Sequence, residues 1–264
     1  MKRCIVSADD FAFNAAVDDG VLALIGAGRV TATSCLTTSP RWPDAARRLD
    51  AAARARADVG VHVDLTEFER LASSHASLVF ACYTRTIDAN RLRAVLRTQL
   101  QRFEDALDSP PDYIDGHRHV HQLPVVRDAL IELLVDRYPI RTPWVRVSCD
   151  GGGADWKGTL ITRLGSDGLS ARCRAAGVAT NSRLLGLYDF KDDSASYPSR
   201  LSAWVEDEVD RDVLVCHPAS GIDAGDPIGR ARLAEFEAMS SPWWKDCLES
   251  HQIRLCRGAE CVTP

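Results

Sequence analysis

Short apolar or β-branched runs alternate along this chain with longer segments of helical period, a pattern typical of parallel strands joined by helices. Eight runs are expected to form strands: Cys4–Ala8, Val30–Leu36, Val59–Val63, Tyr113–Asp115, Trp144–Val147, Arg183–Leu187, Val213–Cys216 and Ile253–Leu255. Seven segments are expected to form helices: Ala15–Ala27, Pro43–Ala55, Ala89–Leu107, Pro124–Arg137, Asp155–Ala176, Pro198–Asp207 and Ala231–Ser250. The pattern predicts an α/β protein of seven or eight strand–helix units. No repeat or change of composition divides it, so we expect one domain over residues 1–264.

Two irregular segments, Glu67–Asp88 and Cys149–Lys157, each follow a predicted strand. In a barrel of parallel strands, the loops at the carboxyl ends of the strands carry the binding residues. Both segments are therefore expected to border a binding site.

Composition and charge narrow the class of protein. The chain has 264 residues, of which 45% are hydrophobic, and this excludes a disordered or low-complexity protein. With 32 Lys and Arg against 37 Asp and Glu, the net charge is −5. There is no dense basic stripe, so we expect no nucleic-acid partner.

The sequence also predicts where the protein resides. The apolar run at the start is too short for a signal peptide, and nothing elsewhere approaches the roughly 18 apolar residues of a membrane-spanning helix. We therefore expect a cytoplasmic protein without membrane insertion. The 9 cysteines lack any CxxC spacing, so we expect reduced thiols, including the neighbouring Cys256 and Cys261.

Polar residues with catalytic potential stand at the ends of four predicted strands. They are Asp9 and Asp10, His62, the run from Asp115 to His121 that contains His117 and His119, and His217. Parallel strands open their carboxyl ends on one face, so groups far apart in the sequence can meet there. Each cluster alone has a structural alternative. Asp10 or Asn14 could cap the helix near Ala15, and His62 could be an ordinary core histidine.

Taken together, the clusters point to a metal site. Two neutral imidazoles and a carboxylate form a common set of ligands for a divalent metal, which can activate water and polarise a carbonyl. Hydrolysis of an amide also needs a base for the water proton and an acid for the leaving amine. If Asp10 is a ligand, Asp9 can serve as the base and His217 as the acid. The period-two spacing of His117, His119 and His121 leaves open which of them is a ligand.

The same residues resemble the motifs of a known family. Ser7-Ala8-Asp9-Asp10-Phe11, Gly60–Thr66, Tyr113–His121, Tyr188-Asp189-Phe190 and Cys216-His217-Pro218 occur in the order found in the YdjC-like carbohydrate deacetylases. That family includes chitooligosaccharide deacetylases and deacetylases associated with hopanoid biosynthesis. The resemblance runs from residue 4 to about residue 257.

The resemblance implies a distorted (β/α) barrel related to the polysaccharide deacetylases. It implies one divalent metal ion, zinc or magnesium, held by Asp10, His62 and His117, with Asp9 as the base and His217 as the acid. The substrate would be a small N-acetylated carbohydrate, and a homodimer is consistent with the family. His119 and His121 would then lie behind the ligands or contact the substrate.

Three features depart from the family's usual pattern. Ala12 stands where glycine is usual, Asp64 stands where an uncharged residue is usual, and the segment Glu67–Asp88 is short for a substrate-binding insertion. Two other functions remain open. The HxH patterns also occur in amidohydrolase and phosphoesterase metal centres, and a relative without turnover would be a glycan-binding protein.

Several larger side chains are weaker candidates. Arg146 could orient a site carboxylate through a bidentate contact. Trp144, Trp156 and Tyr188 could stack on a sugar ring, although aromatic residues of this size commonly lie in the core. The pair Trp243-Trp244 is interpreted as helix packing or part of a subunit interface.

Overall fold

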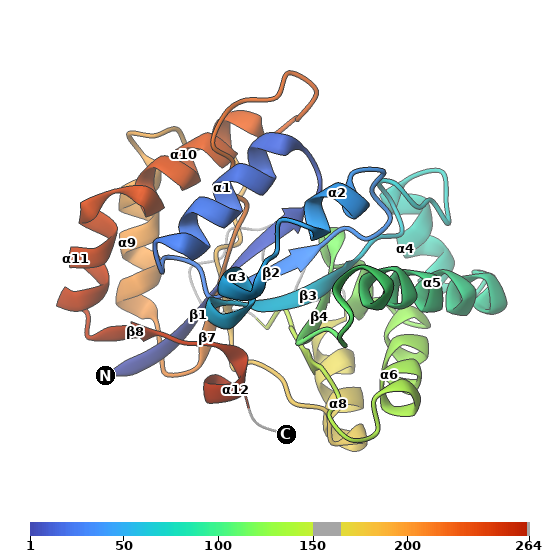
Figure 1. The fold of residues 1–264 in the computed structure, drawn as a ribbon. Coiled ribbons are helices and arrows are strands. Elements are labelled where there is room, and N and C mark those ends of the chain that lie inside the picture. Colours follow the sequence, from blue (N-terminus) through green and yellow to red (C-terminus); the bar gives the residue numbers. More distant parts are fainter. Residues whose placement is uncertain (150–164, 263–264) are drawn as a thin grey trace.

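The computed structural model describes residues 1–149 and 165–262, and its centre is one parallel β-sheet (Figure 1). The strands are β1 Lys2–Phe11, β2 Ala32–Cys35, β3 Asp58–Val63, β4 Tyr113–Gly116, β5 Trp144–Val145, β6 Leu184–Leu185, β7 Asp212–Cys216 and β8 Ile253–Leu255. Their order is β5-β4-β3-β2-β1-β7-β6, and β8 also pairs with β1. All eight predicted strands are present, which confirms the α/β fold.

β1 occupies the middle of the sheet and pairs with three other strands along its length. Its first residues pair with β8, Cys4–Ala8 pairs with β7, and its last residues pair with β2. Residues 4 to 11 of this strand are all buried, as expected for a strand covered by helices on its outer face and by side chains within. The carboxyl end of β1 therefore lies at the centre of the barrel mouth.

The edge strands β5 and β6 are connected by isolated hydrogen bonds between residues in or next to them. The backbone N–H of Leu184 donates to the carbonyl of Cys149 at 2.9 Å, and that of Val145 donates to the carbonyl of Ala179 at 2.9 Å. The side chain of Asn181 accepts from Val147 N and donates to Val147 O. These contacts bring the sheet round into a distorted barrel, as predicted.

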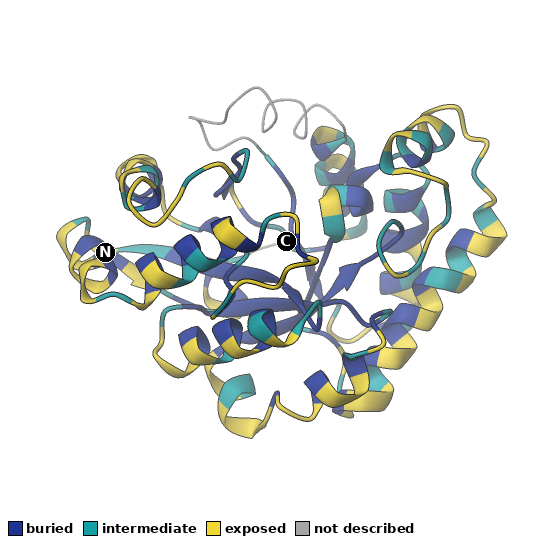
Figure 2. Ribbon diagram, turned by 90° about the horizontal axis from the view of Figure 1, so that it is seen from above, coloured by how far each residue is buried: buried dark blue, intermediate teal, exposed yellow. Residues whose placement is uncertain are grey.

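Helices surround the sheet, with exposed residues on their outer faces and buried strands at the centre (Figure 2). They are α1 Ala15–Gly26, α2 Trp42–Ala46, α3 Ala51–Arg56, α4 His75–Tyr83, α5 Ala89–Leu107, the 3-10 helix η1 His117–Gln122, α6 Val126–Arg137, α8 Ser166–Ala176, α9 Tyr197–Asp207, α10 Gly229–Ser240, α11 Pro242–Ser250 and α12 Gly258–Cys261. In α5 the buried positions recur at helical spacing and include Leu92, Leu96 and Leu100.

Three predicted helices differ from the structure. The segment Pro43–Ala55 forms two short helices, α2 and α3, and Ala231–Ser250 is divided into α10 and α11 at Pro242, whose ring cannot continue a helix. The segment Glu67–Asp88, expected to be irregular, contains α4. Of the predicted helix Asp155–Ala176, the part from Ser166 is α8, and the earlier part, with Trp156, lies outside the described residues.

The expectation of nine free thiols is wrong, because Cys256 and Cys261 form a disulfide. The bond joins the end of β8 to α12, and the N–H of Cys256 donates to the carbonyl of Cys4 near the start of β1. The disulfide therefore lies toward the amino end of the central strand. None of the helices in residues 1–149 and 165–262 is both long and apolar enough to cross a membrane.

Two of the aromatic candidates, Trp144 and Trp244, are buried in the core. Trp144 stacks on Tyr113 with ring centroids 4.5 Å apart and is buried, and it is not among the residues that line the pocket described below. Trp244 is buried in α11, which agrees with packing, whereas its neighbour Trp243 is 37% exposed.

Candidate metal centre

The end of β1 turns two consecutive carboxylates into the barrel mouth. Successive residues of a strand normally point to opposite faces. Here the pairing of β1 with β2 shifts register between Ala8 and Phe11, and Asp10 has a positive φ of 67°. This local bulge lets Asp9 and Asp10 face the same site. The helix that follows is capped by Asn14, whose side chain accepts from Val17 N, so neither aspartate serves as its cap.

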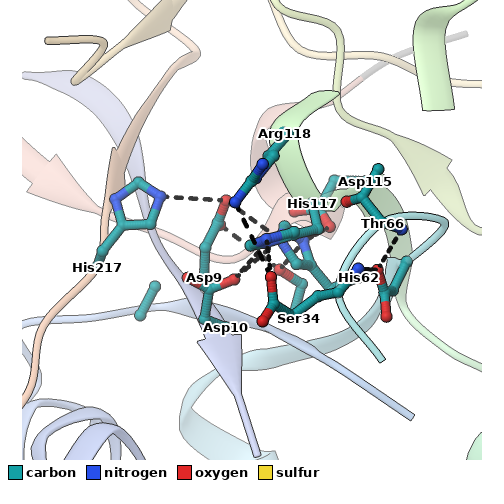
Figure 3. Close-up of polar contacts among 12 residues, drawn as sticks. Asp9, Asp10, Ser34, His62, Thr66, Asp115, His117, Arg118 and His217 are labelled. Atoms are coloured by element: carbon teal, nitrogen blue, oxygen red, sulfur yellow. Dashed lines mark hydrogen bonds and ion pairs between the residues drawn. The ribbon is translucent and has the colours of Figure 1, made fainter. Parts of the chain in front are cut away.

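Asp10 of β1, His62 of β3 and His117, the first residue of η1 after β4, converge at one point (Figure 3). Oδ1 of Asp10 lies 2.9 Å from Nδ1 of His117 and 3.3 Å from Nε2 of His62. Their ligand atoms all lie within 4.8 Å of one another, close enough for one ion. The three residues that the sequence predicted as ligands are therefore brought together.

His62 is oriented by a carboxylate on its far side. Its Nδ1 lies 2.6 Å from Oδ1 of Asp115 and 3.0 Å from Oγ of Ser34. A carboxylate can only accept, so Nδ1 carries a ring proton, and Nε2 is the nitrogen that faces Asp10. Burial alone would lower the pKa of His62, but Asp115 and Asp9 outweigh burial and raise it to about 10. The surrounding carboxylates thus favour a positive charge at this point.

Asp9 is held by the fully buried guanidinium of Arg146, which confirms the bidentate contact suggested by the sequence. Nη2 of Arg146 also lies 3.1 Å from Oδ2 of Asp115. Burial opposes the charge of Asp9, but Arg146 and His62 outweigh it and lower its pKa to about 2. Asp9, His62 and Asp115 form a second cluster of possible ligands. Arg146 occupies both oxygens of Asp9, whereas Oδ1 of Asp10 faces the two histidines, so the Asp10 cluster is the better candidate.

The second oxygen of Asp10 is bound by Arg232, which sequence reasoning missed. Nη2 of Arg232 donates to Oδ2 of Asp10 at 2.7 Å, and its Nε donates to Asp226 at 2.6 Å. Arg232 is only 2% exposed. Because one oxygen of Asp10 is occupied in this way, the other, Oδ1, is left to face the two histidines.

His217 lies across the site from the ligand cluster, with Nε2 3.9 Å from Oδ2 of Asp9. Burial lowers its pKa to about 4, so the imidazole is neutral near pH 7. Its buried Nδ1 has no hydrogen-bond partner among the described residues and lies 4.0 Å from Oε1 of Glu235. Phe190 packs edge-on against the ring at 5.0 Å, which limits its rotation.

Glu235 is a second functional candidate that sequence reasoning missed. Its carboxylate accepts the backbone N–H of His217, and Tyr188 donates its hydroxyl to Oε1 at 2.6 Å. Burial raises the pKa of Glu235 to about 7. Arg232 and Glu235 are three residues apart in α10 and so share one helix face, but the same spacing is common among exposed charges, so the sequence gives no specific signal for them.

His119 and His121 do not lie on the same face as His117, although their period-two spacing predicts that they could. Residues 117 to 122 form η1, in which Arg118 and His119 adopt left-handed φ values of 52° and 59°. Nδ1 of His119 lies 2.8 Å from Oγ of Ser148, whereas Nε2 of His121 lies 2.7 Å from the carbonyl of Arg146. Within the described residues neither joins a possible ligand cluster, which argues against an HxH metal centre.

A pocket of about 510 Å³ opens above these groups. Asp9, Asp10, His62, His117 and His217 all line it, so the five predicted site residues share one cavity. Other lining residues are Phe13, Glu67, His75, Arg118, His119, Tyr188, Phe190, Asp226 and Arg232. The cavity offers both aromatic faces and polar groups to a ligand.

Comparison with known sequences identifies relatives. The family described as "YdjC-like protein" matches residues 3–250. A human carbohydrate deacetylase is 29% identical over 170 residues, which cover 58% of this chain and 51% of the human protein. A chitooligosaccharide deacetylase of Yersinia pestis is 29% identical over 159 residues, covering 53% of this chain and 62% of that protein. The aligned region thus spans between half and two thirds of these relatives.

Comparison with solved structures identifies the fold. A protein of Enterococcus faecalis, described as a candidate cellobiose-phosphate cleavage protein, superposes with a TM-score of 0.70 at 22% identity and covers 98% of both chains. A peptidoglycan N-acetylglucosamine deacetylase superposes with a TM-score of 0.56 at 11% identity, covering 98% of this chain and 87% of its own. The predicted relation to the polysaccharide deacetylase fold is confirmed.

Proposed function

Because the chain belongs to the YdjC-like protein family, we propose that it is a metal-dependent hydrolase that removes the acetyl group from an N-acetylated amino sugar. The observation that carries the proposal is the convergence of Asp10, His62 and His117 beside Asp9 in one pocket. The names of the human and Yersinia relatives, a carbohydrate deacetylase and a chitooligosaccharide deacetylase, support the substrate class. We assign the activity to a single domain spanning residues 1–264.

Asp10, His62 and His117 would hold one divalent ion through a carboxylate oxygen and two ring nitrogens. The convergence of the three side chains supports this fit, because their ligand atoms all lie within 4.8 Å of one another. The carboxylates of Asp115 and Asp9 add negative charge beside His62. When bound, the ion supplies Lewis acidity for the amide carbonyl and for water. Two nitrogens and one oxygen suit zinc, and magnesium is the alternative.

Asp9 would accept a proton from the attacking water. It is ionised at neutral pH because Arg146 stabilises its negative charge, and the bidentate contact fixes the direction of its oxygens. A base held in one orientation can take a proton without reorganising. Asp9 itself is not one of the three proposed ligands.

His217 would deliver a proton to the departing nitrogen. Because its pKa is lowered by burial, the neutral ring must first gain a proton. Its Nε2 faces Oδ2 of Asp9, so the proton taken from water can pass from Asp9 to His217 and then to the amine. The cleaved amide and one water thus yield acetate and a free amino sugar, with all protons accounted for.

A mass-spectrometric screen tests the proposal. The protein is incubated with N-acetylated sugars, chitooligosaccharides and glycolipids, with and without a chelator, and each product is examined for loss of one acetyl group. We expect deacetylation that the chelator abolishes and added metal restores. The matched control is Asp10→Asn, which should be inactive. Metal-replete protein that binds a chitooligosaccharide and releases no acetate would instead favour a glycan-binding protein.

A further inference from the structure

The loop after β3 is held in place by one buried carboxylate, that of Asp64. Its oxygens accept the backbone N–H groups of Thr66, Glu67, Phe68 and Glu69 at 2.8 to 3.0 Å. Gln99 of α5 in turn binds the backbone of Asp64, accepting from its N–H at 2.9 Å and donating to its carbonyl at 2.7 Å. Asp64 is not among the possible metal ligands of the described residues; it fixes the loop that carries Glu67.

The fixed loop places Glu67 beside one of the proposed ligands. Oε2 of Glu67 lies 3.9 Å from Nε2 of His117, on the side of the ring away from Asp10. Nδ1 of His117 is the nitrogen that faces Oδ1 of Asp10, at 2.9 Å. The two ring nitrogens of His117 therefore face two different carboxylates.

This arrangement has a consequence for the ring proton. To act as a ligand, Nδ1 of His117 must present a lone pair, so the proton of the neutral ring resides on Nε2. An imidazole that binds a metal usually donates its other N–H to a carboxylate, a carbonyl or water, which fixes the ring and increases its basicity. Asp115 has this role for His62, at 2.6 Å from Nδ1. Glu67 is the carboxylate in the corresponding position for His117.

We propose that Glu67 is a positioning residue that accepts the Nε2–H of His117 and so orients this ligand for the metal. The inference rests on the proposed metal centre. The Glu67 side chain is 29% exposed and can move, and a shift of about 1 Å brings its oxygen within hydrogen-bond distance of Nε2. Arg118, whose Nη2 also lies 3.9 Å from Oε2, offsets part of the negative charge of Glu67.

Calorimetric titration with Co²⁺ tests this role without any substrate. Glu67→Gln is compared with Glu69→Gln, a change in the same loop that removes the same charge from a side chain of similar exposure, 34% against 29%. We expect Glu67→Gln to weaken Co²⁺ binding by about tenfold or more. We expect Glu69→Gln to remain within about twofold of the wild type. Glu67→Asp, which keeps the charge but withdraws the oxygens by one methylene, should fall between them.

The visible absorption spectrum of the Co²⁺-loaded protein provides a second measurement, because it reports the arrangement of the ligands. The spectrum of Glu67→Gln should differ from that of the wild type, and that of Glu69→Gln should not. If the wild type binds Co²⁺ and both glutamine variants match it in affinity and spectrum, Glu67 does not orient His117. The proposed metal centre itself would remain supported by that result. If the wild type itself fails to bind Co²⁺, the metal centre and this inference both fall.

Discussion

Arg146 donates two hydrogen bonds to the carboxylate of Asp9, from Nη1 to Oδ1 and from Nη2 to Oδ2, each 2.6 Å long. The guanidinium is fully buried and also contacts Asp115 and the hydroxyl of Ser7. One arginine is therefore shared by the proposed base and the carboxylate behind His62. The same buried arginine therefore contributes to the stability of the fold and orients the proposed base.

Replacement of Arg146 should destabilise the fold. Arg146→Met leaves two buried carboxylates without their cation, and the expected loss of unfolding free energy is about 3–5 kcal/mol. Chemical denaturation at pH 7 measures it. Arg93→Met removes a surface pair with Glu132 and should change stability by no more than about 1 kcal/mol. Equal losses of unfolding free energy in the two variants would show that the buried ion pairs of Arg146 stabilise the fold no more than a surface pair does.

The roles of the two neighbouring aspartates can be separated. Asp9→Asn should reduce acetate release by at least about 100-fold while leaving Co²⁺ affinity within severalfold of wild type, because Asp9 acts as a base and not as a ligand. Asp10→Asn should lose both properties. Calorimetry and an acetate assay on the same preparations make the comparison. Undiminished turnover in Asp9→Asn would remove Asp9 from the mechanism.

Glu235 should make the fold less stable as the pH rises. Its pKa is raised from 4.5 to about 7 by burial, so between these values the unfolded chain releases a proton that the folded protein retains. Stability attributable to this group is therefore complete below about pH 4.5 and is lost as the pH approaches 7. Glu235→Gln should remove on the order of 3 kcal/mol from the difference in unfolding free energy between pH 5 and pH 8. Urea titrations at both pH values measure it.

The control for that experiment is Glu237→Gln, which changes an exposed residue of the same helix. It should keep the wild-type difference between the two pH values. If the Glu235 variant also keeps it, the pKa of Glu235 does not differ between the folded and unfolded protein.

Ala12 lies in strained backbone. Its φ is 75°, its N–H donates to Asp18 and its carbonyl accepts from Ser39, so the conformation is held on both sides. A positive φ costs a residue with a Cβ about 1 kcal/mol, whereas glycine adopts it without this cost. Ala12→Gly should therefore raise the unfolding free energy by about 1 kcal/mol. The same change at the exposed helical position Ala23 should lower it by about 0.5–1 kcal/mol, and denaturation curves should show opposite shifts.

The alternation of apolar runs and helical segments was sufficient to predict the parallel sheet. Strand residues such as Val59, Val61 and Val63 are buried because β-branched side chains pack well between layers, and this preference is local. The position of Asp9, Asp10, His62 and His217 at strand ends was also visible in the sequence, since parallel strands present those ends on one face.

Other features depended on contacts between distant segments. Residues 117 to 122 form a 3-10 helix in which Arg118 and His119 have positive φ, and period-two spacing does not reveal that turn. Burial also could not be predicted for Arg232 and Glu235, because charged residues in a helix usually face water.

The sequence by itself determined the order of strands and helices and the chemical groups available at the strand ends, because periodicity and residue type act over a few neighbouring positions. Only the tertiary structure decided which of three nearby histidines faces Asp10, which arginine binds each aspartate, and that Glu67 stands behind His117. Those relationships depend on how separate segments pack, and packing is settled by the whole chain folding together.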